Sequence, residues 1–214
     1  MAKSTLELQA LVASKRQIVR RRLQEFANML FSPPEEIFAE LCFCICTPQS
    51  KAELCDLAVR ELENHNLLMH GPWDQVRNVL HGVRFRNVKA RRIVKARRLF
   101  RGVAASSTLS MLRSNMDPPT LREWLITEVD GVGMKEASHF LRNIGLGSEL
   151  AILDRHILRS LSEYEILPTV PHYLSAKRYV KIEERMKLFA QKLNVSLEEL
   201  DLLLWWKETG RIFK

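Results

Sequence analysis

The chain has 214 residues, of which 46% are hydrophobic and 27% charged, and its formal net charge is +8. This composition is typical of one large or two small globular domains, and it argues against wholesale disorder. The longest apolar stretch, residues 37–46, is too short for a membrane span, which needs about 20 residues. The first residues show no apolar run after a positive charge, so we expect neither a secretory signal nor a membrane segment, and hence a cytoplasmic protein.

Helical patterns recur along the chain, whereas the alternating pattern of a strand is nearly absent. Proline is found in the expected first turn after Ser32 and after Asp117, and Ser196 with Glu199 forms a capping box. The sequence therefore predicts an all-α protein. We expect about eleven helices, at residues 5–30, 34–46, 50–63, 72–80, 86–103, 107–114, 119–129, 134–144, 155–163, 175–193 and 197–208.

The cysteines all lie in the first part of the chain, at Cys42, Cys44, Cys46 and Cys55. Three of them alternate along an apolar run, which is not the spacing of a zinc or iron–sulfur site. The six histidines show no paired metal spacing either. We therefore expect buried thiols in a reducing compartment, no side-chain metal ligand and no cofactor.

The positive charge is concentrated between Asp74 and Asp117, a segment without any acidic residue. On the expected helix 86–103, apolar residues at 93, 96, 100 and 103 share one face and basic residues lie on another. Salt bridges need both signs of charge, whereas binding to phosphates needs one, so this segment predicts a polyanionic partner. Its basic residues are Arg77, Arg84, Arg86, Lys89, Arg91, Arg92, Lys95, Arg97, Arg98, Arg101 and Arg113.

A possible phosphate site follows at residues 129–137, where Gly131 and Gly133 precede the expected helix 134–144. Glycine lets the backbone turn sharply and approach another molecule, and the first N–H groups of a helix are unpaired and can bind an anion. Many such turns only connect helices. The nearby basic segment favours nucleic-acid binding.

The hairpin with Lys135, the stretch 145–147 and Asp154 together resemble the helix-hairpin-helix, Gly/Pro-rich loop and aspartate signature of base-excision DNA glycosylases. More specifically, residues 133–143 and 152–158 resemble the second family of 8-oxoguanine DNA glycosylase/AP lyases. The resemblance extends to residues 84–90 and 205–214 and so covers most of the chain.

This resemblance implies a helix-hairpin-helix glycosylase architecture with two helical subdomains. One would comprise residues 34–150 and carry the hairpin, and the other would combine residues 1–33 with 151–214. Residues 145–147 would lie near the end of the first subdomain. No cysteine follows Cys55, so the C-terminal iron–sulfur motif of endonuclease III-like relatives is missing.

The implied activity is excision of 8-oxoguanine followed by strand cleavage. Lys135 would attack C1′ of the flipped nucleotide and form a Schiff base, and β-elimination would follow. Asp154 would stabilise positive charge on the sugar and help to deprotonate the lysine. From the residues alone, Lys135 could equally be a solvated helix lysine and Asp154 a helix N-cap, although capping is compatible with catalysis.

The resemblance also implies residues that recognise the base. Trp205 would lie against it, and the α-carboxylate of Lys214 would accept the N7–H of 8-oxoguanine, which guanine lacks. Phe85 could help to form the base pocket or could be a core residue. Gln49 would probe the gap left by the flipped base, or belong to a simple connecting loop. For Trp206 we expect a place in the core.

The expected partner is double-stranded DNA that contains oxidised guanine, bound by a monomer associated with the nucleoid. Two alternatives stay open: a glycosylase for another lesion, such as an oxidised pyrimidine, and a non-catalytic helix-hairpin-helix DNA-binding module. In relatives of this kind the hairpin can bind a cation through backbone carbonyls. The expected DNA-binding residues are Gln49, Arg84, Arg86, Arg91, Lys95, Arg98, Gly131 and Gly133.

Overall fold

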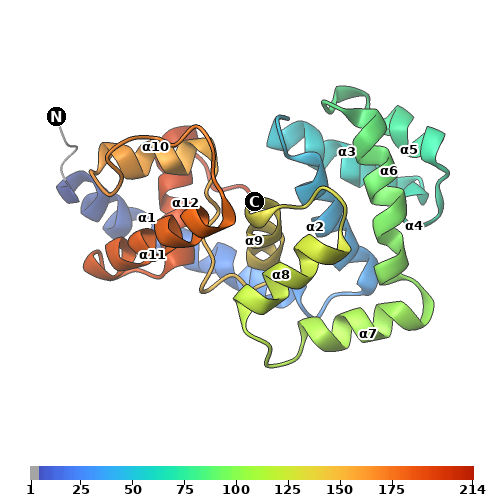
Figure 1. Ribbon diagram of the computed structural model, residues 1–214, viewed down its shortest axis with the longest axis horizontal. Coiled ribbons are helices and arrows are strands. Elements are labelled where there is room, and N and C mark those ends of the chain that lie inside the picture. Colours follow the sequence, from blue (N-terminus) through green and yellow to red (C-terminus); the bar gives the residue numbers. More distant parts are fainter. Residues whose placement is uncertain (1–4) are drawn as a thin grey trace. The chain divides into compact units, whose positions relative to one another are not determined.

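The computed structural model describes residues 5–214, and throughout this range the regular structure is helical (Figure 1). The predicted all-α class is confirmed. The α-helices are α1 (Thr5–Met29), α2 (Pro34–Cys46), α3 (Ala52–Asn64), α4 (Leu67–His70), α5 (Trp73–Val79), α6 (Arg86–Ala96), α7 (Gly102–Leu112), α8 (Pro118–Glu128), α9 (Met134–Asn143), α10 (Arg155–Glu163), α11 (Ala176–Lys192) and α12 (Leu197–Thr209).

The chain folds into two compact units. The terminal unit consists of Met1–Asn28 and Leu141–Lys214, and the central unit of Met29–Phe140. The boundaries between the units therefore lie after residues 28 and 140. The subdomains expected from the sequence, 34–150 and 1–33 with 151–214, stay a prediction.

In the terminal unit, helices α10, α11 and α12 gather around α1 (Figure 1). Val12, Val19 and Phe26 of α1 form a buried cluster with Leu202 and Leu203 of α12. Burial of these side chains joins the two ends of the chain in one core. A further close approach occurs at Gly145, whose φ is +79° and where a Cβ atom would collide with the backbone of Ala27. Only glycine suits this position.

In the central unit, α2 is buried from Ile37 to Cys46 and packs against α3 and α6. Such burial on all sides explains why this segment is the longest apolar stretch of the sequence. Cys42, Cys44, Cys46 and Cys55 are buried thiols, as expected. Burial raises the pKa of the Cys55 thiol to about 11, so this thiol is protonated at neutral pH.

Two helix predictions were wrong. The expected helix 86–103 ends at Ala96 and continues as a 3₁₀ turn over Arg97–Phe100. Arg101 is extended and Gly102 has a φ of +54°, so the backbone breaks there and α7 begins five residues before the expected position 107. Val103 is 86% exposed and does not continue the apolar face. The four-residue helix α4 was not predicted.

The predicted helix starts near Asp117 and at the capping box of Ser196 are confirmed. Asp117 caps α8 by accepting a hydrogen bond from the backbone N–H of Thr120. Ser196 and Glu199 form the complete capping box of α12. These polar side chains pair backbone N–H groups that the first turn of a helix leaves free, so they fix where each helix begins.

Candidate active site

The turn between α8 and α9 contains both glycines of the predicted hairpin. Gly131 has a φ of +75°, and a Cβ atom at this position would collide with the guanidinium of Arg92. Glycine is therefore required here both by the left-handed backbone and by the close packing of Arg92 from α6. The structure places this arginine, which sequence reasoning did not single out, directly on the hairpin.

The backbone N–H of Gly133 is already paired. It donates a hydrogen bond of 3.2 Å to Oε2 of Glu136, a carboxylate in the first turn of α9. The expectation of unpaired N–H groups concerned the first turn of the helix itself, which begins at Met134, and stays a prediction. A carboxylate at a helix N-terminus is favourable because the helix dipole is positive there. A phosphate would have to displace or share the Glu136 carboxylate.

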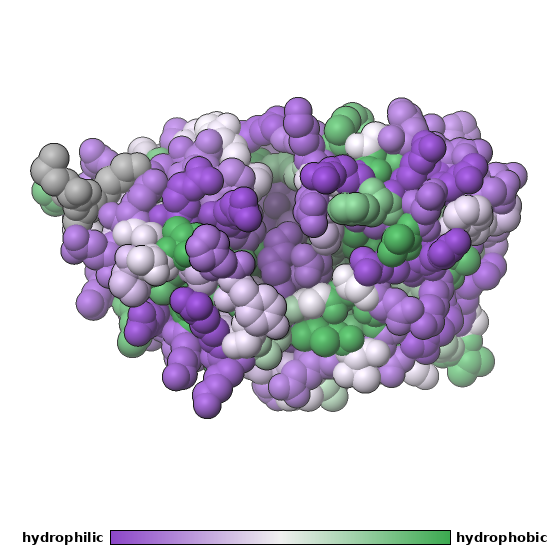
Figure 2. Space-filling view, turned by 45° about the horizontal axis from the view of Figure 1, so that its top comes forward, coloured by the Kyte–Doolittle hydropathy of each residue, from purple (hydrophilic) through white to green (hydrophobic). Residues whose placement is uncertain are grey.

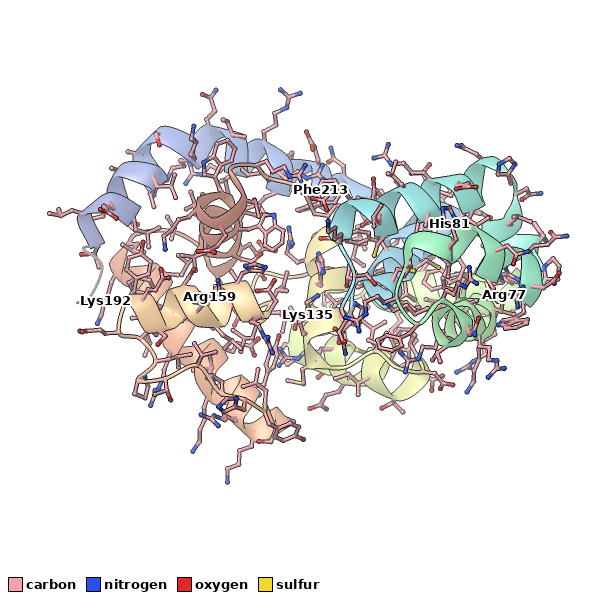
Figure 3. The ribbon with its side chains drawn as sticks, turned by 90° about the horizontal axis from the view of Figure 1, so that it is seen from above. Arg77, His81, Lys135, Arg159, Lys192 and Phe213 are labelled. Carbon is pink, nitrogen blue, oxygen red and sulfur yellow. The ribbon has the colours of Figure 1, made fainter. Side chains whose placement is uncertain are left out.

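Lys135 lies in the first turn of α9 and is half-buried (Figure 3). Its Nζ donates a hydrogen bond of 3.4 Å to Oγ1 of Thr47, whose own hydroxyl donates to the Cys44 carbonyl at 3.0 Å. The amine is thus tethered by the end of α2, unlike the freely solvated helix lysine considered from the sequence. The bond is long, so the amine keeps freedom to reach another partner.

Packing within the central unit fixes the helix that carries this lysine. The ring of His139 on α9 packs edge-on against Phe43 of α2, with 5.5 Å between the ring centroids. Nη1 of Arg122 on α8 donates to the Ser138 hydroxyl at 3.2 Å. The buried face of α9 is therefore held by both α2 and α8, and the first turn with Lys135 is held with it.

Asp154 belongs to the terminal unit and is the N-cap of α10. Its Oδ1 accepts a hydrogen bond of 2.8 Å from the backbone N–H of Ile157. The preceding segment is fixed by Tyr179, whose hydroxyl accepts from the Leu153 N–H and donates to the Ala151 carbonyl. The capping role considered from the sequence is confirmed, and it gives the half-buried carboxylate a defined position.

Trp205 on α12 is half-buried, and its indole packs edge-on against the ring of His156 with centroids 5.5 Å apart. Its Nε1 is buried and has no hydrogen-bond partner among residues 5–214. A buried indole N–H usually finds an acceptor, so this donor is an exception to the usual pattern. Trp206 is half-buried beneath the ammonium of Lys15 rather than in the core, contrary to expectation.

The segment after α12 is held by α1. Nε of Arg22 donates a hydrogen bond of 2.9 Å to the carbonyl of Phe213 (Figure 3). Lys214 follows this anchored peptide and is half-buried. Both residues belong to the terminal unit, which also carries Trp205 and Asp154.

Phe85 and Gln49 both have left-handed backbone conformations, with φ of +59° and +56°. Phe85 is 55% exposed beneath the guanidinium of Arg84, so the core position considered for it is wrong. Gln49 is exposed in the loop between α2 and α3. Non-glycine residues in this conformation cost about 1 to 3 kcal/mol and persist only where the surroundings hold them.

The expected basic surface is smaller than the sequence suggests. Arg84, Arg86 and Arg91 are exposed, and the visible face in Figure 2 is mostly hydrophilic with small hydrophobic groups. Lys95 and Arg98 instead form salt bridges with hairpin acids, Asp130 at 2.6 Å and Glu128 at 2.7 Å respectively. The hydrogen bond from Lys95 lowers the pKa of Asp130. Acids distant in sequence thus compensate part of the charge.

Two basic residues of the segment are not on the surface at all. Lys89 and Arg97 are 1% and 5% exposed. Lys89 was counted among the basic residues of the sequence, and its burial was not expected. Lys89 nevertheless precedes Ile93 by four residues and Ala96 by seven, which puts it on the apolar face of α6. A lysine on the apolar face of a helix was the signal that could have identified it.

No cluster of three or more potential His, Cys, Asp or Glu metal ligands occurs within residues 5–214. Over the same described range, no helix combines the length and the apolar character needed to cross a membrane.

Comparison with known proteins gives consistent matches. A family model described as 8-oxoguanine DNA glycosylase matches residues 19–195. An 8-oxoguanine DNA glycosylase/AP lyase of Fusobacterium nucleatum is 39% identical over 91% of this chain and 90% of its own.

Two crystal structures are also similar. That of the 8-oxoguanine DNA glycosylase of Thermotoga maritima has a TM-score of 0.87 and 32% identity, covering 97% of both chains. That of the Methanocaldococcus jannaschii 8-oxoguanine glycosylase/lyase, in complex with a 15mer DNA containing 8-oxoguanine, has a TM-score of 0.86 and 33% identity, covering 97% of this chain and all of that one.

Proposed function

Because the chain belongs to the 8-oxoguanine DNA glycosylase family, we propose that it excises 8-oxoguanine from double-stranded DNA and then cleaves the strand by β-elimination. The observation that carries this proposal is the half-buried Lys135 in the first turn of α9, tethered by Thr47. We further propose that the protein acts as a monomer and associates with the nucleoid.

Lys135 is the proposed nucleophile. Its neutral amine attacks C1′, the bond from C1′ to N9 of the base breaks, and the base leaves with the bonding electrons and is protonated. The sugar ring then opens to a Schiff base between C1′ and Nζ. Loss of a C2′ proton expels the 3′ phosphate and cleaves the strand. A partly enclosed amine with one weak partner suits this role, because Thr47 orients it without locking it.

Asp154 is the proposed electrostatic stabiliser. Positive charge develops on the sugar as the bond to the base breaks, and a fixed carboxylate lowers the energy of that state. The cap to Ile157 supports this proposal, because it holds the carboxylate in one orientation before the reaction begins.

Trp205, Phe85 and Lys214 are the proposed base-recognition residues. The exposed ring of Phe85 and the half-buried indole of Trp205 each offer an aromatic face on which a flipped base can stack. The bond between Arg22 and the Phe213 carbonyl supports the part proposed for Lys214, because it fixes the preceding peptide.

The proposed DNA contacts are of two kinds. Exposed groups without an ion pair within the described chain can bind phosphates directly, whereas Lys95 and Arg98 must first release their carboxylate partners. Gln49 in its left-handed loop would enter the gap left by the flipped base. The residues available without rearrangement are Arg84, Arg86 and Arg91. The turn at Gly131 and Gly133 becomes available once the Glu136 carboxylate releases the Gly133 N–H.

A borohydride trapping experiment tests the mechanism. Duplex DNA with 8-oxoguanine opposite cytosine is incubated with the protein, and reduction should give a covalent adduct that is lost in Lys135→Gln. Lys187→Gln is the matched control, because Lys187 is also partly exposed but forms a salt bridge with Glu149 on the terminal unit. An adduct that persists in Lys135→Gln would contradict the assignment. If neither the wild-type protein nor the variants formed an adduct, the result would favour a non-catalytic DNA-binding module.

A further inference from the structure

Lys89 places an ammonium group inside the central unit. Its side chain is 1% exposed, and Nζ donates hydrogen bonds to the carbonyls of Cys46 and Pro48, both at 2.7 Å, and to the Ser50 hydroxyl at 3.1 Å. An ammonium group has three N–H donors, so every donor is used. All three acceptors are neutral, and all come from residues 46–50.

Burial of an ammonium group is costly unless its donors are bonded. Desolvation lowers the pKa of Lys89, which shows that the surroundings disfavour its charge. The group nevertheless joins α6 to the loop between α2 and α3 through bonds that an apolar side chain of the same length could not make. The buried ammonium group therefore holds the loop between α2 and α3 in one defined conformation.

This loop carries two residues of the proposed active site. Thr47 accepts the hydrogen bond of the Lys135 amine, and Gln49 has the left-handed backbone. The same hydrogen-bond network includes the turn at Phe85. The Phe85 carbonyl accepts a hydrogen bond from the backbone N–H of Lys89, and the backbone N–H of the neighbouring Arg84 donates to the Ser50 hydroxyl. Lys89 therefore joins the loop before α3 and the left-handed turn before α6.

We propose that Lys89 is a positioning residue of the reaction, which holds the 46–50 loop so that Thr47 meets the Lys135 amine and Gln49 faces the DNA. The proposal rests on the function proposed above. Lys89 itself does not touch the reacting atoms. It acts through Thr47 and Ser50.

Lys89→Met tests this proposal, because it keeps the length of the side chain and removes all three donors. We expect the single-turnover rate of base release at saturating protein to fall about tenfold or more, as happens when a reacting group is misplaced. The Kd for the same DNA should change by less than about twofold, because Lys89 is buried and contributes no phosphate contact. If Lys89 had only a structural role, Lys89→Met would lower the melting temperature but would not reduce the rate while leaving the Kd unchanged.

Arg97→Met is the matched control. Arg97 is also a buried cation of the central unit and also donates to three backbone carbonyls, of Leu67, Leu68 and Gly71, but these lie at α4 and not at the loop. Its loss should destabilise the protein and leave the single-turnover rate at a permissive temperature within about twofold of the wild type. An equal fall in both variants would overturn the proposal, and so would an unchanged rate in Lys89→Met.

Ser50→Ala provides a second, milder test that does not depend on the folding of Lys89→Met. It removes one acceptor of Lys89 and the acceptor of the Arg84 N–H, and we expect an intermediate loss of rate. A wild-type rate in Ser50→Ala would contradict the positioning role. Failure of the proposed function is distinguishable, since the wild-type protein would then release no base at all.

Discussion

Asp154 shows how one residue can serve both the fold and the proposed chemistry. The carboxylate caps α10 through Ile157, and the two oxygens of a carboxylate allow it to cap a helix and to face a substrate at once. Asparagine caps a helix about as well as aspartate, whereas alanine does not. The two roles can therefore be separated by substitution.

Asp154→Asn should keep the cap and lose the charge. We expect an unfolding free energy within about 0.5 kcal/mol of the wild type, since asparagine replaces the capping acceptor. The single-turnover rate of base release should fall by about 10² to 10³, the usual cost of losing one electrostatic contact to a transition state. Thermal melting and rapid-quench kinetics measure the two effects.

Asp154→Ala is the companion variant. It should show the same loss of rate and in addition lose about 1 kcal/mol of stability, because the Ile157 N–H loses its acceptor. If Asp154→Asn retained the wild-type rate, Asp154 would be a cap and nothing more.

The sequence could predict the identity of these residues better than their surroundings. Lys135 and Asp154 were found through short motifs, because the spacing of such motifs depends on local backbone structure. The tether at Thr47 depends on a contact between residues 88 positions apart, which no local pattern encodes. For the same reason the packing of Arg92 on Gly131 was not foreseen. The pairing of Gly133 with Glu136 is local, joining residues three positions apart, and was overlooked.

At the scale of elements, α6 combines a buried lysine, exposed arginines and a paired lysine within eleven residues. The exposed Arg91 lies over the indole of Trp73, with 5.4 Å from Cζ to the ring centroid. Lys95, one turn further along, is bonded to Asp130. Basic residues on one helix thus differ in how much charge they can offer to DNA.

Arg91→Ala and Lys95→Gln test this difference. Removing one phosphate-binding cation should reduce the slope of log Kd against log salt concentration by about 0.9. We expect this change in Arg91→Ala, whereas Lys95→Gln should change the slope by less than about 0.3, because Asp130 already neutralises the lysine. Titrations by fluorescence anisotropy at several salt concentrations measure both. Equal slopes for the two variants would show that the salt bridge opens freely on DNA.

Element boundaries could be predicted where a side chain marks them. The starts of α2, α8, α10 and α12 all follow a proline or a capping residue, and the expected starts lay within one residue of these. The break between α6 and α7 has no such mark, since Gly102 lies within an apolar periodicity that runs on to Val103. Helix α4 has only four residues, too few for a periodic pattern to appear.

At the scale of the whole molecule, the net charge of +8 led to the correct class of partner for a DNA glycosylase family. The basic residues that cluster along the sequence do not all contribute positive charge to the surface of the folded protein. Burial removes Lys89 and Arg97 from the surface, and hairpin carboxylates pair with Lys95 and Arg98. Counting charges along a chain cannot detect either effect, because both depend on tertiary contacts.

The most direct test of the proposed function measures the release of free base from matched duplexes. These duplexes carry 8-oxoguanine, guanine or an oxidised pyrimidine opposite the same partner base. We predict that the wild-type protein releases 8-oxoguanine, that guanine is released at least about 10²-fold more slowly, and that Lys135→Gln releases neither. Preferential release of the oxidised pyrimidine, or equal release of guanine and 8-oxoguanine, would contradict the proposal.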